Sequence, residues 1–415
     1  MRKSFRIAVR QFEPFESAIR KQWEIFAIQS ATDLTLDLVA MDLHALYQAL
    51  FEDAGLRRGD FDVAFLNTDW LALAERQNAV LDLEPFLIRN PPQDYPGGWS
   101  ESLLRLQLVN HRVLGVPYHD GPETLIYRTD LFHDPAEQEA YFKLHGTQLR
   151  PPSTWEEFHQ IARYFQRPKD GIYGTAFAAF PDGHNTVYDF LLQLWTRGGE
   201  LFDERGRLSL ASPQAAEALT FYRAMIQDRS ATHPDCQVFD SVKAGMAFAA
   251  GEVAMMVNWF GFAAMAQTIA SSSVKDCVDL APIPHAEGAS STSLNIYWLL
   301  AIAAGSPRPD VSYAFLRHCM SPEMDQLLTL EGAVGCRKST WTDPKVNRAI
   351  PFYHRLGELH KNARELPATE KWPQIASLIE ELITRVVQTR IPIQELLEDT
   401  HAKGALIAIG ARGGE

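Results

Sequence analysis

A phenol, an imidazole and a carboxylate stand in succession at Tyr118, His119 and Asp120, and together they can donate and accept hydrogen bonds. Prolines and a glycine around these residues prevent regular secondary structure. The apolar, β-prone run at 125–127 follows and predicts a buried strand. Such a strand could deliver the three side chains to the wall of a binding cleft, and an ordinary surface loop is the alternative.

The element after this strand is predicted to be a helix. Ser153 is followed three residues later by Glu156, which is the spacing of a capping box at a helix start. Trp155, Phe158 and Ile161 then recur with helical spacing and give the helix an apolar stripe. The polar loop therefore lies between two ordered elements.

Three further groups of polar and aromatic residues lie where predicted strands end. The strands are expected at Phe5–Val9, Leu34–Val39 and Phe61–Phe65, with residues at helical spacing between them. This alternation predicts an α/β fold with a mostly parallel sheet, in which ligands collect at the carboxyl ends of the strands. The residues that follow the strands are Glu13, Phe15 and Glu16, then Met41 and Asp42, then Asn67, Asp69 and Trp70. Helix capping by the aspartates and burial of Trp70 are the structural alternatives, but the convergence of three loops favours a binding surface.

The composition limits the kind of protein that this chain can form. A chain of 415 residues with 46% hydrophobic residues is long enough for two or three domains or two large lobes. The net charge of −13 and the lack of a basic run argue against nucleic acid as a partner and favour a neutral or cationic ligand. No apolar run reaches the roughly 20 residues that a membrane-spanning helix needs.

The cysteines are too far apart to indicate a metal site. They are Cys236, Cys277, Cys319 and Cys336, without a Cys-x-x-Cys pair or a histidine at zinc-ligand spacing. We expect no metal and no cofactor. Buried free thiols are expected, and a disulfide between Cys319 and Cys336 is the alternative.

Several motifs occur in the same order as in one known family. They are Gly-Val-Pro-Tyr at 115–118, Tyr-Arg-Thr-Asp-Leu at 127–131, Pro-Ser-Thr-Trp-Glu-Glu at 152–157, Ser-Pro at 212–213, and Gly-Glu-Val-Ala-Met at 251–255 before Trp259. With these motifs the chain resembles the family 1 extracellular solute-binding proteins, the maltose-binding-protein-like carbohydrate receptors of bacterial import transporters. The resemblance covers nearly the whole chain, and the ordered set is more specific than any single motif.

The resemblance implies a type II periplasmic-binding-protein-like fold of two α/β lobes joined by a hinge of about three crossovers. Lobe 1 would comprise 1–115 and 284–329, lobe 2 would comprise 118–280 and 333–415, and the hinge would lie near 115–118, 280–284 and 329–332. It further implies the substrate-binding protein of an ABC transporter, which captures a mono- or oligosaccharide or a related polyol by hinge closure. The expected partners are this ligand and the membrane permease subunits, with the protein acting as a monomer.

A sugar presents hydroxyl groups at its edges and C–H patches on its faces, so carboxylates, amides and flat aromatic rings are expected around it. The resemblance places at the ligand Glu13, Phe15, Asp42, Asn67, Asp69, Trp70, Tyr118, His119, Asp120, Phe180, His184, Asn185, Trp259, Asn295, Tyr297, Arg337 and Trp372. Trp259, at the exit of a strand predicted at Val253–Val257, is the main stacking candidate, with a core position as the alternative. For Arg337 and Trp372 the alternatives are a salt bridge and packing between helices.

The chain departs from the family pattern at Ile296-Tyr297, where the family often has consecutive glycines. Asn295 and Tyr297 are two apart on a predicted strand, so their side chains are expected on the same side. The departure suggests that a side chain fills space that a larger ligand would otherwise use.

Two alternatives come from other classes of protein. A glycoside hydrolase would need two carboxylates on either side of a scissile bond, but nothing in the sequence fixes such a pair, and we expect no enzyme. A cytoplasmic ligand sensor could share the fold. The family is periplasmic or extracellular, whereas the start of this chain lacks the apolar segment of a signal peptide, so either the signal peptide has been removed or the chain is a cytoplasmic relative.

Overall fold

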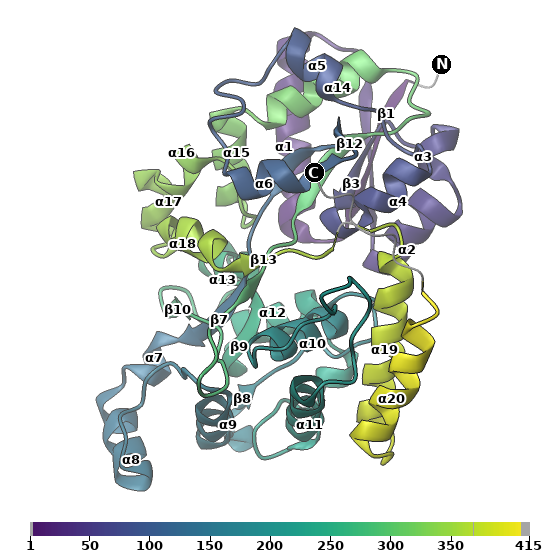
Figure 1. Cartoon of the computed structure of the whole chain (residues 1–415). Coiled ribbons are helices and arrows are strands. Elements are labelled where there is room, and N and C mark those ends of the chain that lie inside the picture. Colours follow the sequence, from purple (N-terminus) through teal and green to yellow (C-terminus); the bar gives the residue numbers. More distant parts are fainter. Residues whose placement is uncertain (1–2, 368, 408–415) are drawn as a thin grey trace. The chain divides into compact units, whose positions relative to one another are not determined.

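The computed structural model describes residues 3–367 and 369–407 and divides into two compact units, both discontinuous in sequence (Figure 1). Unit 1 comprises Met1–Pro122, Asn295–His360 and Glu365–Glu370, and unit 2 comprises Glu123–Leu294, Lys361–Arg364 and Lys371–Glu415. Each unit contains one main sheet with helices packed against it.

The sheet of unit 1 has five strands in the order β2-β1-β3-β12-β6. These strands are β1 (Ser4–Arg10), β2 (Thr35–Met41), β3 (Val63–Asn67), β6 (Val116–His119) and β12 (Trp298–Ile302). β1 is parallel to β2 and β3, whereas β12 is antiparallel to β3 and β6. The predicted parallel β-α-β opening is therefore confirmed, and the returning strand makes the sheet mixed.

Aromatic packing fixes the helices of unit 1 on this sheet. The Phe5 ring stacks on Trp23 with centroids 4.8 Å apart, and Phe315 lies 5.4 Å from Trp23, so β1, α1 and α14 share one core. The helices are α1 (Glu13–Ser30), α2 (Leu43–Tyr47), α3 (Gly55–Arg58), α4 (Leu71–Arg76), α5 (Glu84–Arg89), α6 (Glu101–Leu106), α14 (Pro309–Cys319), α15 (Pro322–Leu330), α16 (Lys338–Trp341), α17 (Pro344–Ala349) and α18 (Leu356–Lys361). Shorter elements are a π-helix at Gln48–Glu52, 3₁₀ turns at Thr68–Trp70 and Tyr353–Arg355, and the hairpin of β4 (Leu108–Val109) and β5 (Arg112–Val113).

The main sheet of unit 2 has the order β10-β7-β9-β8. Its strands are β7 (Glu123–Arg128), β8 (Tyr173–Thr175), β9 (Val253–Trp259) and β10 (Val278–Ala281), and β11 (Ser293–Leu294) pairs separately with β13 (Ala363–Arg364). β7 and β9 are antiparallel, with Glu123 directly opposite Trp259. The helices are α7 (Thr129–Phe132), α8 (Pro135–His145), α9 (Trp155–Tyr164), α10 (Asn185–Trp195), α11 (Pro213–Gln227), α12 (Ser241–Ala249), α13 (Phe260–Thr268), α19 (Trp372–Gln388) and α20 (Ile393–Gly404), with 3₁₀ turns at Pro168–Asp170 and Cys236–Val238.

Local signals in the sequence explain several of these boundaries. Ser212 caps α11, as predicted, because its side chain accepts a hydrogen bond from the Ala215 N–H. Gly251, with φ of 86°, supplies the left-handed turn between α12 and β9. The capping box predicted at Ser153 and Glu156 was wrong by one residue, because the structure pairs Thr154 with Glu157.

The unit boundaries lie at other positions than the crossovers expected from the sequence. The segment 280–284 begins inside β10, which pairs with β7 in unit 2. The segment 329–332 lies inside unit 1, where the Asp120 N–H donates a hydrogen bond to the Val334 carbonyl at 2.9 Å. The chain instead changes unit after Pro122, after Leu294 and after His360, and briefly again around 365–370.

One further expectation was wrong, and one alternative is contradicted. Residues 295–297 lie between β11 and β12 and are not part of a strand, because the chain passes from one unit to the other there. The alternative of a Cys319–Cys336 disulfide is contradicted as well, since both are buried free thiols, and Cys236 and Cys277 are also free.

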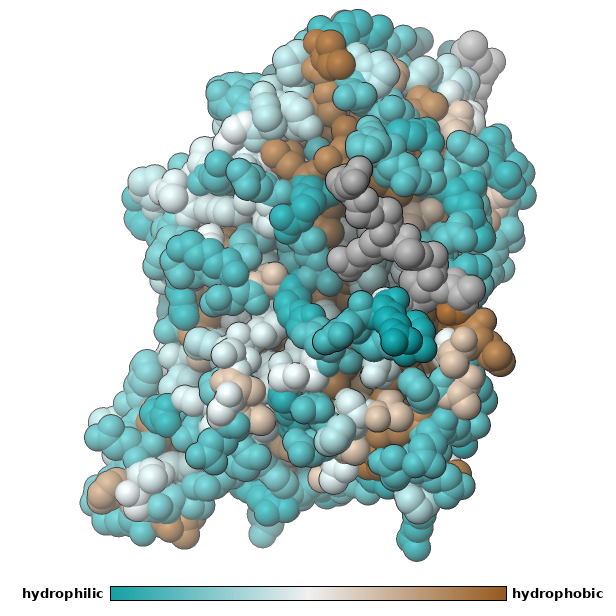
Figure 2. All heavy atoms as spheres, in the orientation of Figure 1, coloured by the Kyte–Doolittle hydropathy of each residue, from teal (hydrophilic) through white to brown (hydrophobic). Residues whose placement is uncertain are grey.

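The face drawn in Figure 2 is largely hydrophilic, with apolar side chains scattered among polar ones. Exposed apolar residues include Phe142 and Leu144 on α8 and Leu406 after α20. Within residues 3–367 and 369–407, no helix has both the length and the hydrophobicity needed to cross a bilayer.

Candidate functional site

The aromatic residues predicted at the strand ends of unit 1 belong to its core. Phe15 is buried, with its ring centroid 5.1 Å from Phe65 and 4.6 Å from His119. Trp70 is buried in an edge-on contact with Trp298 at 5.8 Å. These rings stabilise the sheet edge and leave little of their own surface for a ligand.

The polar residues at the same strand ends form local caps and exposed groups. Asp42 is exposed and caps α2, because its carboxylate accepts a hydrogen bond from the Ala45 N–H at 2.8 Å. Asn67 is buried and accepts one from the Asp69 N–H at 3.4 Å. Glu13, the first residue of α1, is exposed, and Asp69 is partly exposed. The strand ends of unit 1 therefore combine buried aromatic rings with exposed or partly exposed carboxylates.

Tyr118 and His119 were expected in an irregular loop, but they lie on β6, where His119 pairs with Trp298 of β12, and Asp120 directly follows the strand. The buried Tyr118 hydroxyl donates a hydrogen bond to Gln22 Oε1 at 2.8 Å. His119 Nδ1 accepts one from the Val334 N–H at 2.9 Å, and burial lowers the pKa of His119 to about 3. His119 is therefore a neutral imidazole at physiological pH.

Asp120 forms a buried ion pair that the sequence analysis missed. Its Oδ2 lies 2.7 Å from His360 Nε2, and the imidazole stacks on Trp341 with centroids 5.2 Å apart. Ser102 Oγ lies 3.1 Å from the other ring nitrogen of His360. Burial alone would lower the pKa of His360. The charge and hydrogen bond of the Asp120 carboxylate raise it by more than burial lowers it, so the pKa of His360 lies above its ordinary value.

Three more predicted contacts in unit 1 have structural partners or are buried. The guanidinium of Arg337 is 1% exposed, pairs with Asp94 at 2.9 Å and lies 4.6 Å from the Trp99 ring. The Tyr297 hydroxyl donates a hydrogen bond to a carbonyl of α6. Asn295 is buried, and its Oδ1 has no hydrogen-bond partner in the described part of the chain.

Trp259 and Asn185 lie together in unit 2. The Trp259 indole is partly exposed, so it is neither a core side chain nor a free surface ring. Its Nε1–H donates to Asn185 Oδ1 at 3.4 Å, and the Tyr188 ring meets it edge-on at 5.8 Å and 88°. Trp259 and Asn185 were predicted from the sequence, whereas Tyr188 was not.

A neighbouring carboxyl pair, Glu123 and Asp189, was also missed. Glu123 lies opposite Trp259 on the adjacent strand, so both side chains project from the same face of the sheet. Asp189 follows Tyr188 on α10 and lies one helical turn beyond Asn185, which places the three on one helix face. We call Glu123, Asn185, Tyr188, Asp189 and Trp259 the Trp259 cluster.

Both carboxyl groups of the Trp259 cluster resist ionisation. Burial raises the pKa of Glu123 well above its ordinary value, and the charge of Asp189 raises it further. Burial raises the pKa of Asp189 to about 8, although the nearby Tyr222 hydroxyl lowers it. At neutral pH this group of side chains therefore holds protons that exposed carboxylates would have lost.

The remaining predicted residues of unit 2 have different environments. The buried His184 precedes α10, and the Asp182 carboxylate accepts a hydrogen bond from its backbone N–H at 3.0 Å. Phe180 is 45% exposed, and the Lys243 ammonium lies 5.8 Å from its ring. Trp372, the first residue of α19, is buried.

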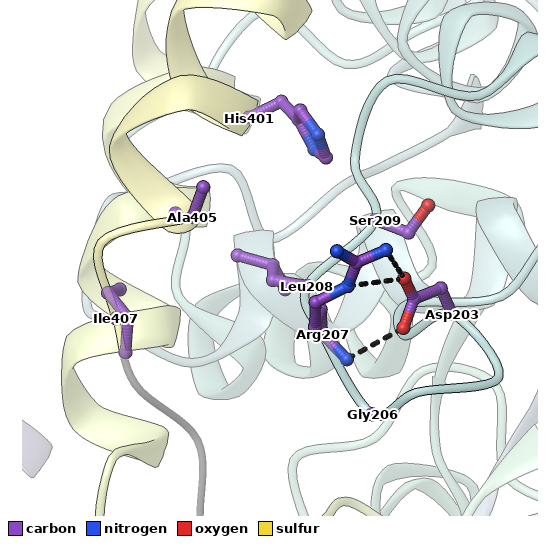
Figure 3. Close-up of a pocket in the computed structure, with 9 residues that line it drawn as sticks. Asp203, Gly206, Arg207, Leu208, Ser209, His401, Ala405 and Ile407 are labelled. Carbon is purple, nitrogen blue, oxygen red and sulfur yellow. Dashed lines mark hydrogen bonds and ion pairs between the residues drawn. The ribbon is translucent and has the colours of Figure 1, made fainter.

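A separate pocket of about 410 Å³ lies in unit 2 between the 203–209 turn and the end of α20 (Figure 3). Among the residues that line this pocket, the Arg207 guanidinium and the Asp203 carboxylate form an ion pair at 2.7 Å. The pocket contains none of the predicted ligand residues. Within residues 3–367 and 369–407, no cluster of histidine, cysteine and carboxylate side chains has a metal-binding arrangement.

Two α/β units, with polar and aromatic side chains at the strand ends of each, define a protein of the type II periplasmic-binding-protein-like fold. Residues 22–326 match the family model of the bacterial extracellular solute-binding proteins, and the chain belongs to this family. Its members are the substrate-binding components of ABC importers, which confirms the resemblance seen in the sequence.

Individual relatives are distant in sequence but similar in fold. A Deinococcus radiodurans protein named as a probable ABC transporter-binding protein is 23% identical over 381 residues, which cover 89% of this chain and 84% of that protein. The maltose-bound MalE3 of T. maritima has a TM-score of 0.84 at 23% identity, covering 98% of this chain and 100% of its own. A ribitol-bound ABC transporter solute-binding protein of Agrobacterium radiobacter K84 also has a TM-score of 0.84, at 21% identity, covering 97% and 98%. At these identities the two structures establish the fold alone.

Proposed function

We propose that this protein captures a neutral sugar or polyol between its two units and delivers it to the permease subunits of an ABC importer. The observation that carries the proposal is the Trp259 cluster, in which a partly exposed indole stands beside carboxyl and amide groups. An aromatic face suits the C–H patches of a sugar, and the polar groups suit its hydroxyls. The structural relatives that carry maltose and ribitol in their names support the same ligand class.

The mechanism is reversible capture without covalent chemistry. A ligand that contacts both units only in a closed arrangement shifts the population toward that arrangement, and the permease binds the closed shape. The chain passes from one unit to the other after Pro122, Leu294 and His360. We propose that these three connections form the hinge. We propose a periplasmic or extracellular location and a monomeric state, and we expect no enzymatic activity.

The ligand contacts that we propose differ in their structural support. In unit 2 we propose Trp259, Asn185, His184 and Phe180 as direct contacts. In unit 1 we propose the exposed or partly exposed carboxylates Glu13, Asp42 and Asp69, together with His119, Asp120 and Asn295 near the chain crossings. For the deeply buried members of the predicted set we propose supporting roles: Phe15, Asn67, Trp70, Tyr118, Tyr297, Arg337 and Trp372.

A thermal-shift screen over sugars, polyols and amino acids tests the proposal. A specific ligand at about a hundredfold its dissociation constant should stabilise the folded protein by about 2.7 kcal/mol. Isothermal titration of the hits, and an assay with aryl glycosides, then separate binding from hydrolysis. If amino acids raised the melting temperature and no carbohydrate did, the assignment to sugars would be wrong while the family would stand.

A further inference from the structure

The carboxyl groups of Glu123 and Asp189 each contain a buried oxygen without a hydrogen-bond partner. Glu123 is 3% exposed, and its Oε2 has no partner in the described part of the chain. Asp189 Oδ2 is also buried and has no hydrogen-bond partner among the described residues. Leaving a buried polar oxygen unsatisfied is costly, and the Tyr222 hydroxyl near Asp189 also lacks a hydrogen-bond partner within the described residues, so the group as a whole indicates a missing partner.

The charged groups that act on this pair within residues 3–367 and 369–407 are acidic. The charge of Asp189 raises the pKa of Glu123, and the charge of Asp182 raises that of Asp189. The titratable groups that face Asp189 are Glu123, the Tyr222 hydroxyl on α11 and the carboxylate of Asp182. The thiol of Cys236 is also near, because the charge of Asp189 raises its pKa. With their pKa values raised above the ordinary range, Glu123 and Asp189 are protonated at neutral pH, so that each carboxyl group offers one O–H donor and one C=O acceptor.

The position of the pair links it to the ligand. Glu123 is the cross-strand neighbour of Trp259, and Asp189 follows Tyr188, whose ring contacts the same indole. A sugar or polyol whose C–H face lies on Trp259 would bring its edge hydroxyls toward this side of the sheet. Hydroxyl groups are both donors and acceptors, and they match protonated carboxyl groups, which also donate and accept.

We propose that Glu123 and Asp189 recognise two neighbouring hydroxyl groups of the ligand and thereby select neutral polyhydroxylated molecules. This inference rests on the proposed function and specifies its ligand class. It predicts that removal of a single hydroxyl from the ligand weakens binding, because a buried carboxyl oxygen is then left without its partner.

Isothermal titration with D-mannitol, ribitol and maltose tests the inference on the whole chain. We expect Glu123→Gln and Asp189→Asn each to weaken the binding of the accepted probe by about 10- to 100-fold. Thr124→Val is the matched control, because Thr124 is adjacent in β7 but its hydroxyl bonds to the Ala281 carbonyl on the edge strand. Its affinity should stay within about twofold of wild type.

A structural role of the pair is separated from direct recognition by monodeoxy analogues of the accepted probe. The wild type should discriminate against at least one analogue, and the variant that lacks the matching carboxyl group should lose this discrimination. If one of the two variants does not fold, the loss or retention of discrimination in the other variant tests the inference.

Three results would overturn the inference. If both variants bound the probe and discriminated between its analogues as the wild type does, Glu123 and Asp189 would not take part in recognition, although the proposed function would stand. Tighter binding of D-glucosamine than of D-glucose would show that the pair acts as an anion for cationic ligands. If the wild type bound none of the carbohydrate probes, the proposed function itself would fail, and this inference with it.

Discussion

At the scale of single residues, the partial exposure of Trp259 matters most. A buried indole would contribute mainly to stability, and an isolated exposed one would have no fixed orientation. Here the Asn185 amide and the Tyr188 ring orient an indole that still has accessible surface. An aromatic side chain that is fixed before binding gives contact area at a low cost in conformational entropy.

Replacing Trp259 with alanine should remove ligand binding while changing the unfolding of the ligand-free protein little. The lost stacking surface and the Asn185 hydrogen bond account for the binding loss, which should exceed about tenfold, and Trp259→Phe should retain part of the affinity. Titration calorimetry measures the affinities, and thermal melts without ligand measure the stability. A loss of several kilocalories in the ligand-free protein would instead assign the indole to the core.

The Asp189 carboxyl group should make stability depend on pH. Its pKa in the folded protein, about 8, is above that of the unfolded chain, so its contribution is fully present below the unfolded pKa. The contribution is lost as the pH rises toward 8, because folding then requires protonation or a buried charge. We therefore expect the free energy of unfolding to fall between about pH 4 and pH 8.

Urea unfolding at pH 5 and pH 8 tests this dependence. The Asp189→Asn variant should lose roughly 1 to 3 kcal/mol less than wild type over this interval, since its amide does not titrate. Asp134→Asn is the control, because the exposed Asp134 serves only as a backbone acceptor at the start of α8. Identical pH profiles for wild type and Asp189→Asn would contradict the prediction.

At the scale of elements, the sequence predicted several of the strands and helices that shape the two sheets. Apolar runs predicted β1, β3, β7 and β9, which are largely buried in the structure, and also β2, whose residues are only partly buried. It also predicted Trp259 at the end of β9. The five-strand order of unit 1 was not predictable in full, since β12 reaches it from far along the chain.

The missed features depend on pairing between distant segments. Glu123 became a candidate only through its register with Trp259, and His360 only through its ion pair with Asp120. No local pattern in the sequence contains either pairing. The course of the chain between the units likewise depends on distant pairings, such as the hydrogen bond from the Asp120 N–H to the Val334 carbonyl within unit 1.

The helix start at Thr154 gives a prediction at this scale. Thr154→Ala should destabilise the protein by about 1 kcal/mol, because its hydroxyl accepts the Glu157 N–H and completes the capping box. Ser153→Ala is the matched control one residue earlier, where the hydroxyl only accepts a hydrogen bond from the Arg150 guanidinium at the surface. Urea unfolding at constant pH gives both values. An equal or larger loss in Ser153→Ala would place the cap where the sequence alone had suggested it.

At the scale of the whole molecule, the two units must respond together if the protein captures its ligand by closure. A ligand moves such an equilibrium only by its difference in affinity for the open and closed forms. A shift from one closed molecule in a hundred to ninety-nine in a hundred requires about a 10⁴-fold difference, and contacts from one unit alone provide no such difference.

Small-angle X-ray scattering with and without the accepted probe tests closure directly. The wild type should become more compact at saturating ligand, as a lower radius of gyration, because the closed form is the one that holds ligand between both units. The double variant Asp42→Asn with Asp69→Asn changes proposed ligand contacts in unit 1 only. It should bind the ligand weakly through unit 2, and at equal occupancy its radius of gyration should fall less than that of the wild type. If the wild type bound tightly with no change in scattering, the ligand would be held by one unit, and capture by closure would have to be abandoned even though the family assignment would remain.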